Sequence, residues 1–147
     1  MTAPDLTKQP PRSPRIRLGG YVLLPRLLDK CRAEIAGKSG EYHFNCPLDQ
    51  QFLSFVGVDA ELLKKEVATG KGDGEILDWI NSHASLRRAP WEIAQWSAWR
   101  DQVTPSDFET REFFNGMHKD AGPNRTDVVT WCDMLDLDDY VSFGGKA

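Results

Sequence analysis

The sequence contains few cysteines and no long apolar run, and each shortage excludes a class of protein. Its three cysteines lie far apart and cannot all pair with one another, which excludes the disulfide framework of a small secreted protein. The longest apolar run, residues 21–25, is far too short to cross a bilayer. The first residues lack the basic and apolar regions of a secretory signal. We therefore expect a soluble, cytoplasmic protein with free thiols and no membrane partner.

Motifs for metals and phosphates are also absent. The three histidines are isolated, and no H-x-x-x-H or C-x-x-C pair occurs. The glycine-rich stretch 70–74 lacks the spacing of a phosphate-binding loop, so we interpret it as a turn between helices. The acidic cluster at 133–139 lacks the central glycine and closing glutamate of a calcium loop, and we interpret it as a solvent-exposed end. The sequence predicts neither a metal site nor a cofactor.

The residues that are present are sufficient for one hydrophobic core. A chain of 147 residues with 40% hydrophobic residues, five tryptophans and seven phenylalanines is long enough to fold without disulfides or metals. No stretch alternates apolar and polar residues for long enough to predict a strand. Neither an internal repeat nor a linker that would divide two cores is visible.

Prolines, glycines and capping residues divide the chain into about seven short helices. Pro25, Pro47 and Pro90 each precede apolar residues at helical spacing, and proline is favoured in the first helical turn. Caps predict the other helix starts, at Asp59, Asp73, the capping box that begins at Ser106, and Thr126. We predict a single all-α domain over residues 21–147.

Residues 1–20 are predicted to form a basic, proline-rich arm. The arm has four prolines and four basic side chains, so it is either a docking peptide in polyproline conformation or, as we favour, a solvated tail wrapped loosely on its own domain. Residues 1–38 carry eight basic against three acidic side chains, whereas residues 39–147 carry ten against nineteen. Because an acidic body repels phosphates, we expect no nucleic-acid partner. A protein or a small molecule is the expected partner, and the oligomeric state is left open.

The densest group of reactive side chains lies just ahead of the helix that Pro47 begins. Cys46 would occupy the N-cap of that helix, where backbone N–H groups and the helix dipole favour a thiolate. His43 could act as its base or stabilise the thiolate as a cation. Asn45 could orient the imidazole ring or donate to an anionic ligand, and Tyr42 is a further candidate ligand contact. The alternative is structural: Cys46 fills a small cavity, His43 bonds a carbonyl and the aromatic rings belong to the core.

Two other features are candidate ligand contacts. Arg26, near the start of the first predicted helix, could hold an anion, although an ion pair with Asp29 one turn later is favoured. Four of the five tryptophans lie within residues 79–99, and Trp96 among them could stack on a ligand. Tryptophans at helical spacing are, however, more often part of the core.

Short stretches spread over residues 12–140 form one combined pattern. They are Leu18–Gly20, Leu24–Arg26, Asp29–Lys30, Arg32, Gly40 through Tyr42 to Cys46–Gln50, Phe52, Gly57–Asp59, Trp79, Thr126–Asp127, Trp131, Asp133 and Leu135–Asp136. This pattern resembles a bacterial family known as domain of unknown function 5069. The resemblance implies a small helical domain and assigns no activity to any residue. Gly72–Gly74 departs from the helix opening that the family has at this point, so the start of that helix is left open.

Three functions are compatible with these observations. The leading hypothesis is a binding or protein-interaction module without catalysis. The competing hypothesis is a small cysteine-dependent enzyme for acyl or thiol transfer, with Cys46 as nucleophile and His43 as its base. The third is a small-molecule-sensing domain with a tryptophan-lined pocket.

Overall fold

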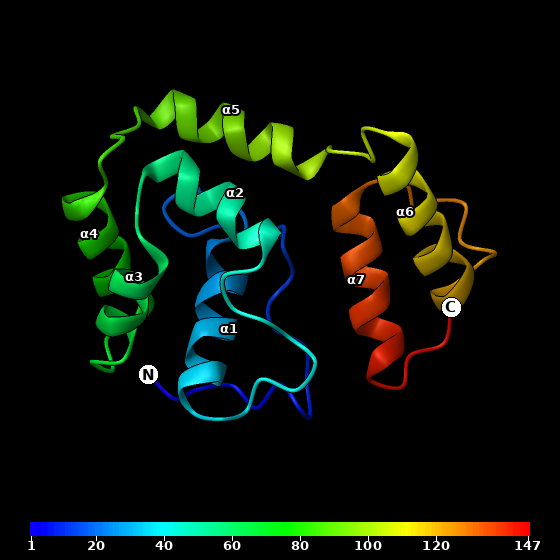
Figure 1. The fold of residues 1–147 in the computed structure, drawn as a ribbon, viewed down its shortest axis with the longest axis horizontal. Coiled ribbons are helices and arrows are strands. Elements are labelled where there is room, and N and C mark those ends of the chain that lie inside the picture. The colour runs from blue at the N-terminus through cyan, green and yellow to red at the C-terminus, as the bar shows by residue number, and fades with distance from the viewer.

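A computed structural model describes residues 1–147 as seven helices with no strand, which confirms the predicted all-α fold (Figure 1). The helices are α1 (Leu24–Ile35), α2 (Pro47–Val56), α3 (Ala60–Val67), α4 (Asp73–His83), α5 (Pro90–Asp101), α6 (Phe108–Ala121) and α7 (Trp131–Ser142). No helix is both long enough and apolar enough to cross a membrane.

The proline-led helix starts are confirmed. Pro25 lies in the first turn of α1, and Pro47 and Pro90 are the first residues of α2 and α5. The predicted cap at Asp59 is also confirmed, because its carboxylate accepts a hydrogen bond from the backbone N–H of Leu62 at 3.0 Å. These signals are local in the chain, so the sequence pattern alone locates them.

Two helices begin later than the sequence pattern predicts. The cap of α6 is Asp107 and not Ser106, since the Asp107 carboxylate accepts from the backbone N–H three residues on at 2.7 Å. The cap of α7 is Thr130 and not Thr126. Thr130 and Asp133 form a reciprocal capping box, with side chain to backbone distances of 3.1 and 2.9 Å. This two-way arrangement fixes the start of α7 more firmly than a single threonine would.

The buried apolar side chains form two clusters. The larger one packs α1, α2, α3 and α4 together around the fully buried Leu27, Leu28, Phe52 and Leu63. The smaller one joins α6 to α7 through Phe114, Val128, Met134 and Leu137. We call residues 1–101 the large lobe and residues 108–147 the helical hairpin. Figure 1 shows the hairpin on the right and α5 running across the top of the large lobe toward it.

The N-terminal arm is held against the large lobe and is not loosely wrapped. Leu6 is buried, and its backbone N–H donates to the carbonyl of Lys38 at 2.9 Å. The Arg12 guanidinium binds the carboxylates of Asp29 at 2.8 Å and Asp73 at 2.7 Å. The arm therefore forms part of the folded structure, and one of its basic side chains is neutralised there.

The predicted cap at Asp73 is wrong, because the N-cap of α4 is Gly72 and Asp73 is the first residue of the helix. The Asp73 carboxylate instead binds two guanidinium groups, those of Arg12 and Arg32, the latter at 2.6 Å. Burial raises the pKa of Asp73, but the hydrogen bonds from Arg12 and Arg32 outweigh it and hold that pKa below its usual value. The cluster ties the arm, α1 and α4 to one another.

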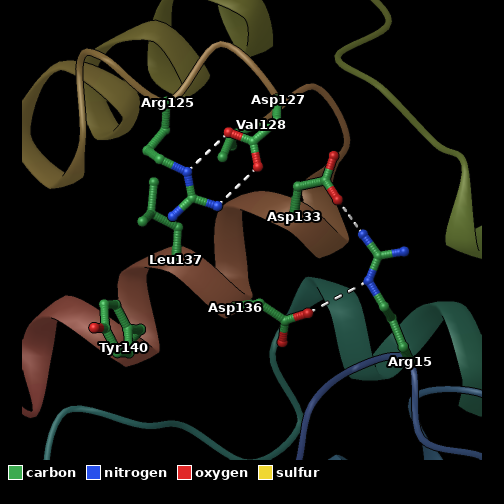
Figure 2. Close-up of a pocket in the computed structure, with 8 residues that line it drawn as sticks. All are labelled: Arg15, Arg125, Asp127, Val128, Asp133, Asp136, Leu137 and Tyr140. Carbon is green, nitrogen blue, oxygen red and sulfur yellow. Dashed lines mark hydrogen bonds and ion pairs between the residues drawn. The ribbon is translucent and has the colours of Figure 1, made fainter. Parts of the chain in front are cut away.

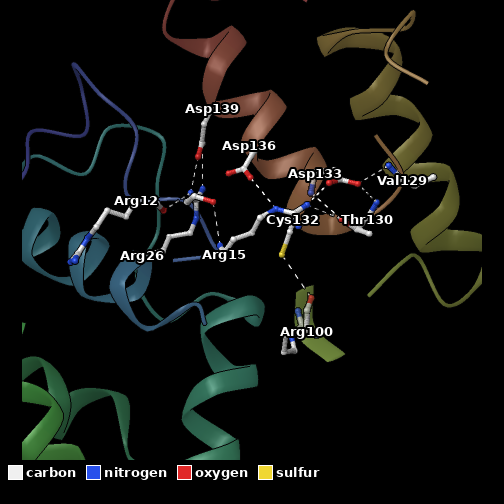
Figure 3. A network of polar contacts seen from close by, with 11 residues as sticks. Arg12, Arg15, Arg26, Arg100, Val129, Thr130, Cys132, Asp133, Asp136 and Asp139 are labelled. Atoms are coloured by element: carbon white, nitrogen blue, oxygen red, sulfur yellow. Dashed lines mark hydrogen bonds and ion pairs between the residues drawn. The ribbon is translucent and has the colours of Figure 1, made fainter. Parts of the chain in front are cut away.

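The acidic cluster on α7 faces the large lobe and is not a solvated end. Asp133, Asp136 and Asp139 recur every three residues and so share one side of the helix. Arg15 of the arm pairs with Asp133 and, at 3.3 Å, with Asp136, and Arg26 of α1 pairs with Asp139 at 2.7 Å (Figure 3). The opposite charges of the two parts of the chain thus meet within the fold and join the hairpin to the large lobe.

Candidate functional site

A cavity of about 820 Å³ lies between the large lobe and the hairpin. One wall comes from α1, the loop that precedes α2 and the first turn of α2, with Leu6 and Thr7 of the arm. The opposite wall comes from α6 and α7 and includes Ser142 and Phe143 at the end of α7. Cavities of this size are typical of sites for small organic molecules.

Four of the six site residues that the sequence singles out line this cavity. They are Arg26, Tyr42, His43 and Cys46, which come from α1 and from the loop before α2. The structure therefore brings the predicted cysteine and histidine to the same cavity. Their catalytic role stays a prediction.

The other two predicted site residues do not line the cavity. Asn45 is exposed, adopts a left-handed backbone conformation with φ of 60°, and accepts a hydrogen bond from Gln50. Trp96 lies against the core of the large lobe, where its ring stacks on that of Phe55 at 4.6 Å. The tryptophan that does line the cavity is Trp131, which lies outside the 79–99 group.

The left-handed turn at Asn45 explains how Cys46 reaches its position. Asparagine tolerates positive φ better than most residues, so the chain can turn there immediately before α2. Cys46 then takes an extended conformation as the N-cap, with φ of −73° and ψ of 170°. Its side chain makes no capping hydrogen bond, which leaves the sulfur available to the cavity.

The partner of the Cys46 sulfur is Lys30 of α1. The Lys30 ammonium donates to Cys46 Sγ at 3.2 Å and pairs with Asp49 Oδ1 at 2.8 Å. The Lys30 and Asp49 side chains are only 5% and 3% exposed, and Asp49 Oδ2 has no hydrogen-bond partner. Burial raises the pKa of Asp49, although Lys30 acts to lower it. His43, by contrast, is exposed and makes no hydrogen bond to the sulfur.

Arg26 does not pair with Asp29, and that part of the sequence interpretation is wrong. Its guanidinium binds Asp139 of α7 at 2.7 and 3.3 Å, with 5% and 8% of the two side chains exposed. The Tyr42 hydroxyl donates to the same carboxylate at 2.6 Å. Burial, and then the Asp139 carboxylate, raise the pKa of Tyr42, so this phenol stays protonated at neutral pH. The charge of Arg26 is thus already neutralised by Asp139, and this ion pair joins the two lobes.

The wall opposite these polar groups is mainly apolar, and Asp138 and Ser142 of α7 are its polar members. It consists mainly of side chains from the hairpin: Phe113, Met117, Trp131, Leu135 and Phe143. The rings of Phe113 and Trp131 lie 6.3 Å apart, and Phe113 is 65% exposed. The cavity therefore offers one polar wall and one apolar wall to a ligand.

Two carboxylates in the lining, Glu41 and Asp138, take part in no ion pair with the cations of the cavity. Those cations are Arg26 and Lys30, whose partners are Asp139 and Asp49. Burial, and then the neighbouring Asp139, raise the pKa of Asp138. No local sequence pattern could have predicted which residues line the cavity on the hairpin side, because contacts such as that of Arg26 with Asp139 join residues 113 positions apart.

A second hollow, of about 480 Å³, is lined by Arg15 of the arm and by residues of the hairpin between Arg125 and Tyr140 (Figure 2). Its charged side chains already pair with one another, Arg15 with Asp133 and Asp136, and Arg125 with Asp127 at 2.8 Å. It therefore offers no unpaired charge to a ligand. Nowhere in the structure do three or more side chains of His, Cys, Asp or Glu gather as a metal site would require.

Comparison with known proteins places the chain in a family. A search of curated proteins gave no match. A family model, described as Domain of unknown function (DUF5069), matches residues 8–141 and so includes most of the residues that line the cavity between the lobes. The match confirms the resemblance expected from the sequence, and the chain belongs to this DUF5069 family.

Proposed function

We propose that the protein binds a small amphipathic organic molecule in the cavity between the large lobe and the hairpin. The observation that carries this proposal is the cavity of about 820 Å³, whose apolar wall faces a wall of polar side chains. An apolar body would gain about 25 cal/mol for each Å² that it removes from water against the hairpin. Its polar end would meet the polar side chains of the lining, which include those of the large lobe and Asp138 of α7.

The contacts between the lobes support a cavity that is formed before the ligand arrives. The buried pair of Arg26 and Asp139, with the hydroxyl of Tyr42, holds α7 against the large lobe at the cavity. A second contact joins the hairpin to the segment that follows α5, where the backbone N–H of Trp131 donates to the carbonyl of Val103 at 3.0 Å. A site that is already ordered loses less entropy on binding.

A nucleic-acid ligand is less favoured. The basic side chains that would attract phosphates already pair with carboxylates within the protein. This holds for Arg12, Arg15, Arg17, Arg26, Lys30 and Arg32. The positive charge of residues 1–38 is therefore largely neutralised in the fold.

The three methionines allow a direct test of the binding proposal. Met117 lines the cavity, whereas Met134 is buried in the hairpin core and Met1 is exposed at the N-terminus. In protein labelled with 13C at the methionine methyl groups, a set of phenylalkyl amines, acids and alcohols should include compounds that shift the Met117 signal saturably. The signals of Met134 and Met1 should stay in place. If no compound shifts the Met117 signal, the proposal is wrong.

A cavity-filling variant provides the control. Leu135→Trp places a large ring in the cavity and should abolish the Met117 shifts, whereas Leu62→Trp on α3, at an exposed position, should not affect them. An unchanged Met134 signal would verify that the hairpin core of Leu135→Trp is folded. Shifts of equal size in both variants would place the binding elsewhere and contradict the proposal.

A second candidate function is acyl transfer through Cys46, and the contact with Lys30 favours it. The ammonium at 3.2 Å from Sγ would stabilise a thiolate. The thiolate would add to the carbonyl carbon of an acyl donor, and the tetrahedral intermediate would expel the leaving group, which takes up a proton. The product is an acyl thioester on Cys46. His43, in the same cavity, is the candidate proton donor to the leaving group.

Mass spectrometry of the protein treated with a thiophenyl ester would test this second function. Cys31 and Cys132 serve as internal controls, because both are buried and burial raises their pKa values to about 12 and about 11. Acylation should occur at Cys46 and be lost in Cys46→Ser. Acylation that is equal at all three cysteines, or absent at Cys46, would rule the function out.

A further inference from the structure

We infer that the ligand of this cavity is an organic cation, with a protonated amine or a quaternary ammonium group on an apolar body. This inference rests on the proposed binding function and names the chemical class of its ligand. Two features of the lining lead to it, the balance of charge and the aromatic side chains.

The positive groups of the cavity are already neutralised. Arg26 pairs with Asp139, and Lys30 pairs with Asp49, in both cases with side chains at most 8% exposed. Each pair places one positive and one negative charge beside the cavity, so the two pairs together contribute no net charge. An anionic ligand would have to compete with a buried carboxylate for either cation.

The negative groups of the cavity are not neutralised in the same way. Glu41 and Asp138 also line it, and neither forms an ion pair or a hydrogen bond with another side chain. Asp138 is half-buried, and burial, followed by Asp139, raises its pKa more than Arg26, whose ion-pair partner is Asp139, lowers it. The lining therefore carries a net negative charge, which a ligand cation would neutralise.

The apolar wall provides a second feature that favours a cation. Phe113, Trp131 and Phe143 present aromatic rings to the cavity, and an ammonium group is attracted to the face of such rings. The Tyr42 ring already has the Arg26 guanidinium over it at 5.5 Å, so the hairpin rings are the ones available. The combination of aromatic rings with unpaired carboxylates is the chemistry that recognises an ammonium group on an apolar body.

A matched set of three ligands tests this inference. They are 4-phenylbutylamine, 4-phenylbutanol and 4-phenylbutyrate, which share one apolar body and differ in the charge of the polar end. We expect the amine to bind about tenfold more tightly than the alcohol, and the butyrate to bind most weakly of the three. Titration calorimetry gives the affinities, and the methyl signal of Met117 verifies that each ligand is in the cavity.

Variants of the two carboxylates locate the origin of the preference. The double variant Glu41→Gln/Asp138→Asn should lose the preference for the amine and keep its affinity for the alcohol. Glu61→Gln, at an exposed position on α3 outside the cavity lining, should behave as the unmodified protein. If the double variant retains the preference, the inference is wrong.

The same titrations separate the two proposals. If the amine, the alcohol and the butyrate all shift the Met117 signal with equal affinity, the cation inference fails and the binding function stands. The same holds if the butyrate binds most tightly. If none of the three ligands shifts that signal, both proposals fail.

Discussion

Replacing Asp139 with asparagine should remove the negative charge that holds the hairpin against α1. The Arg26 guanidinium would then be left buried, only 5% exposed, without its ion-pair partner. The hydroxyl of Tyr42 would also lose its charged acceptor at 2.6 Å. Breaking one half of a buried ion pair costs about 3–5 kcal/mol. For a chain of this length such a loss corresponds to a decrease in Tm of roughly 6–20 °C.

Thermal and urea unfolding followed by circular dichroism would measure this loss. Asp127→Asn is the matched control, because Asp127 pairs with Arg125 at 2.8 Å on the surface, where a pair contributes at most about 1 kcal/mol. The double variant Arg26→Met/Asp139→Leu should recover most of the stability, since it leaves no buried charge unpaired. Equal losses for Asp139→Asn and Asp127→Asn would refute the reasoning, as would a double variant less stable than Asp139→Asn.

Three further predictions concern the Cys46 site, the arm and the loop before α2. Lys30→Met should slow the alkylation of Cys46 by iodoacetamide at neutral pH about tenfold, as measured by peptide mass spectrometry. An unchanged rate would show that Lys30 does not affect the reactivity of the Cys46 thiol. The pKa of Asp73 is lowered in the folded protein, so the stability that it contributes is fully present above 3.8 and declines as the pH falls toward the folded value. Urea unfolding should therefore show Asp73→Asn to be less destabilising at pH 3 than at pH 7, and equal effects at both would contradict this. Gly40→Ala would place a Cβ 2.6 Å from a backbone carbonyl oxygen of the arm, whereas the Cβ of Gly37→Ala meets nothing within 4 Å, and both glycines have positive φ, +56° and +67°. Limited proteolysis of the arm should therefore be faster in Gly40→Ala than in Gly37→Ala. Equal rates would argue against close packing of the arm.

The features that the sequence predicts correctly depend on neighbouring residues. Pro47 fixes a helix start because of its own ring and missing N–H, and Cys46 follows as the N-cap whatever the rest of the chain does. Asp59 caps α3 through a backbone group three residues away. Where two capping residues compete, as Thr126 and Thr130 do, the single residue is not decisive, and the reciprocal bond with Asp133 determines the start of α7.

The features that the sequence does not predict depend on contacts between distant segments. Nothing near Cys46 indicates that Lys30, 16 residues earlier, would bind its sulfur in place of His43. Likewise, the acidic residues of α7 have the pattern of an exposed end, and only the approach of Arg15 and Arg26 makes them a junction between the lobes, which is buried at Asp139. The division into two hydrophobic clusters is not predicted either, because the segment between α5 and α6, residues 102–107, is too short to indicate a boundary by itself.

The measurement that tests the proposed function most directly is a crystal structure of the protein with 4-phenylbutylamine. We predict electron density for the phenyl ring between α1 and α7 in contact with Trp131, and density for the ammonium group beside Asp138. Density for the ligand only outside the cavity, or side chains of the hairpin filling the space between the lobes, would contradict the proposal that this family member binds a small molecule there.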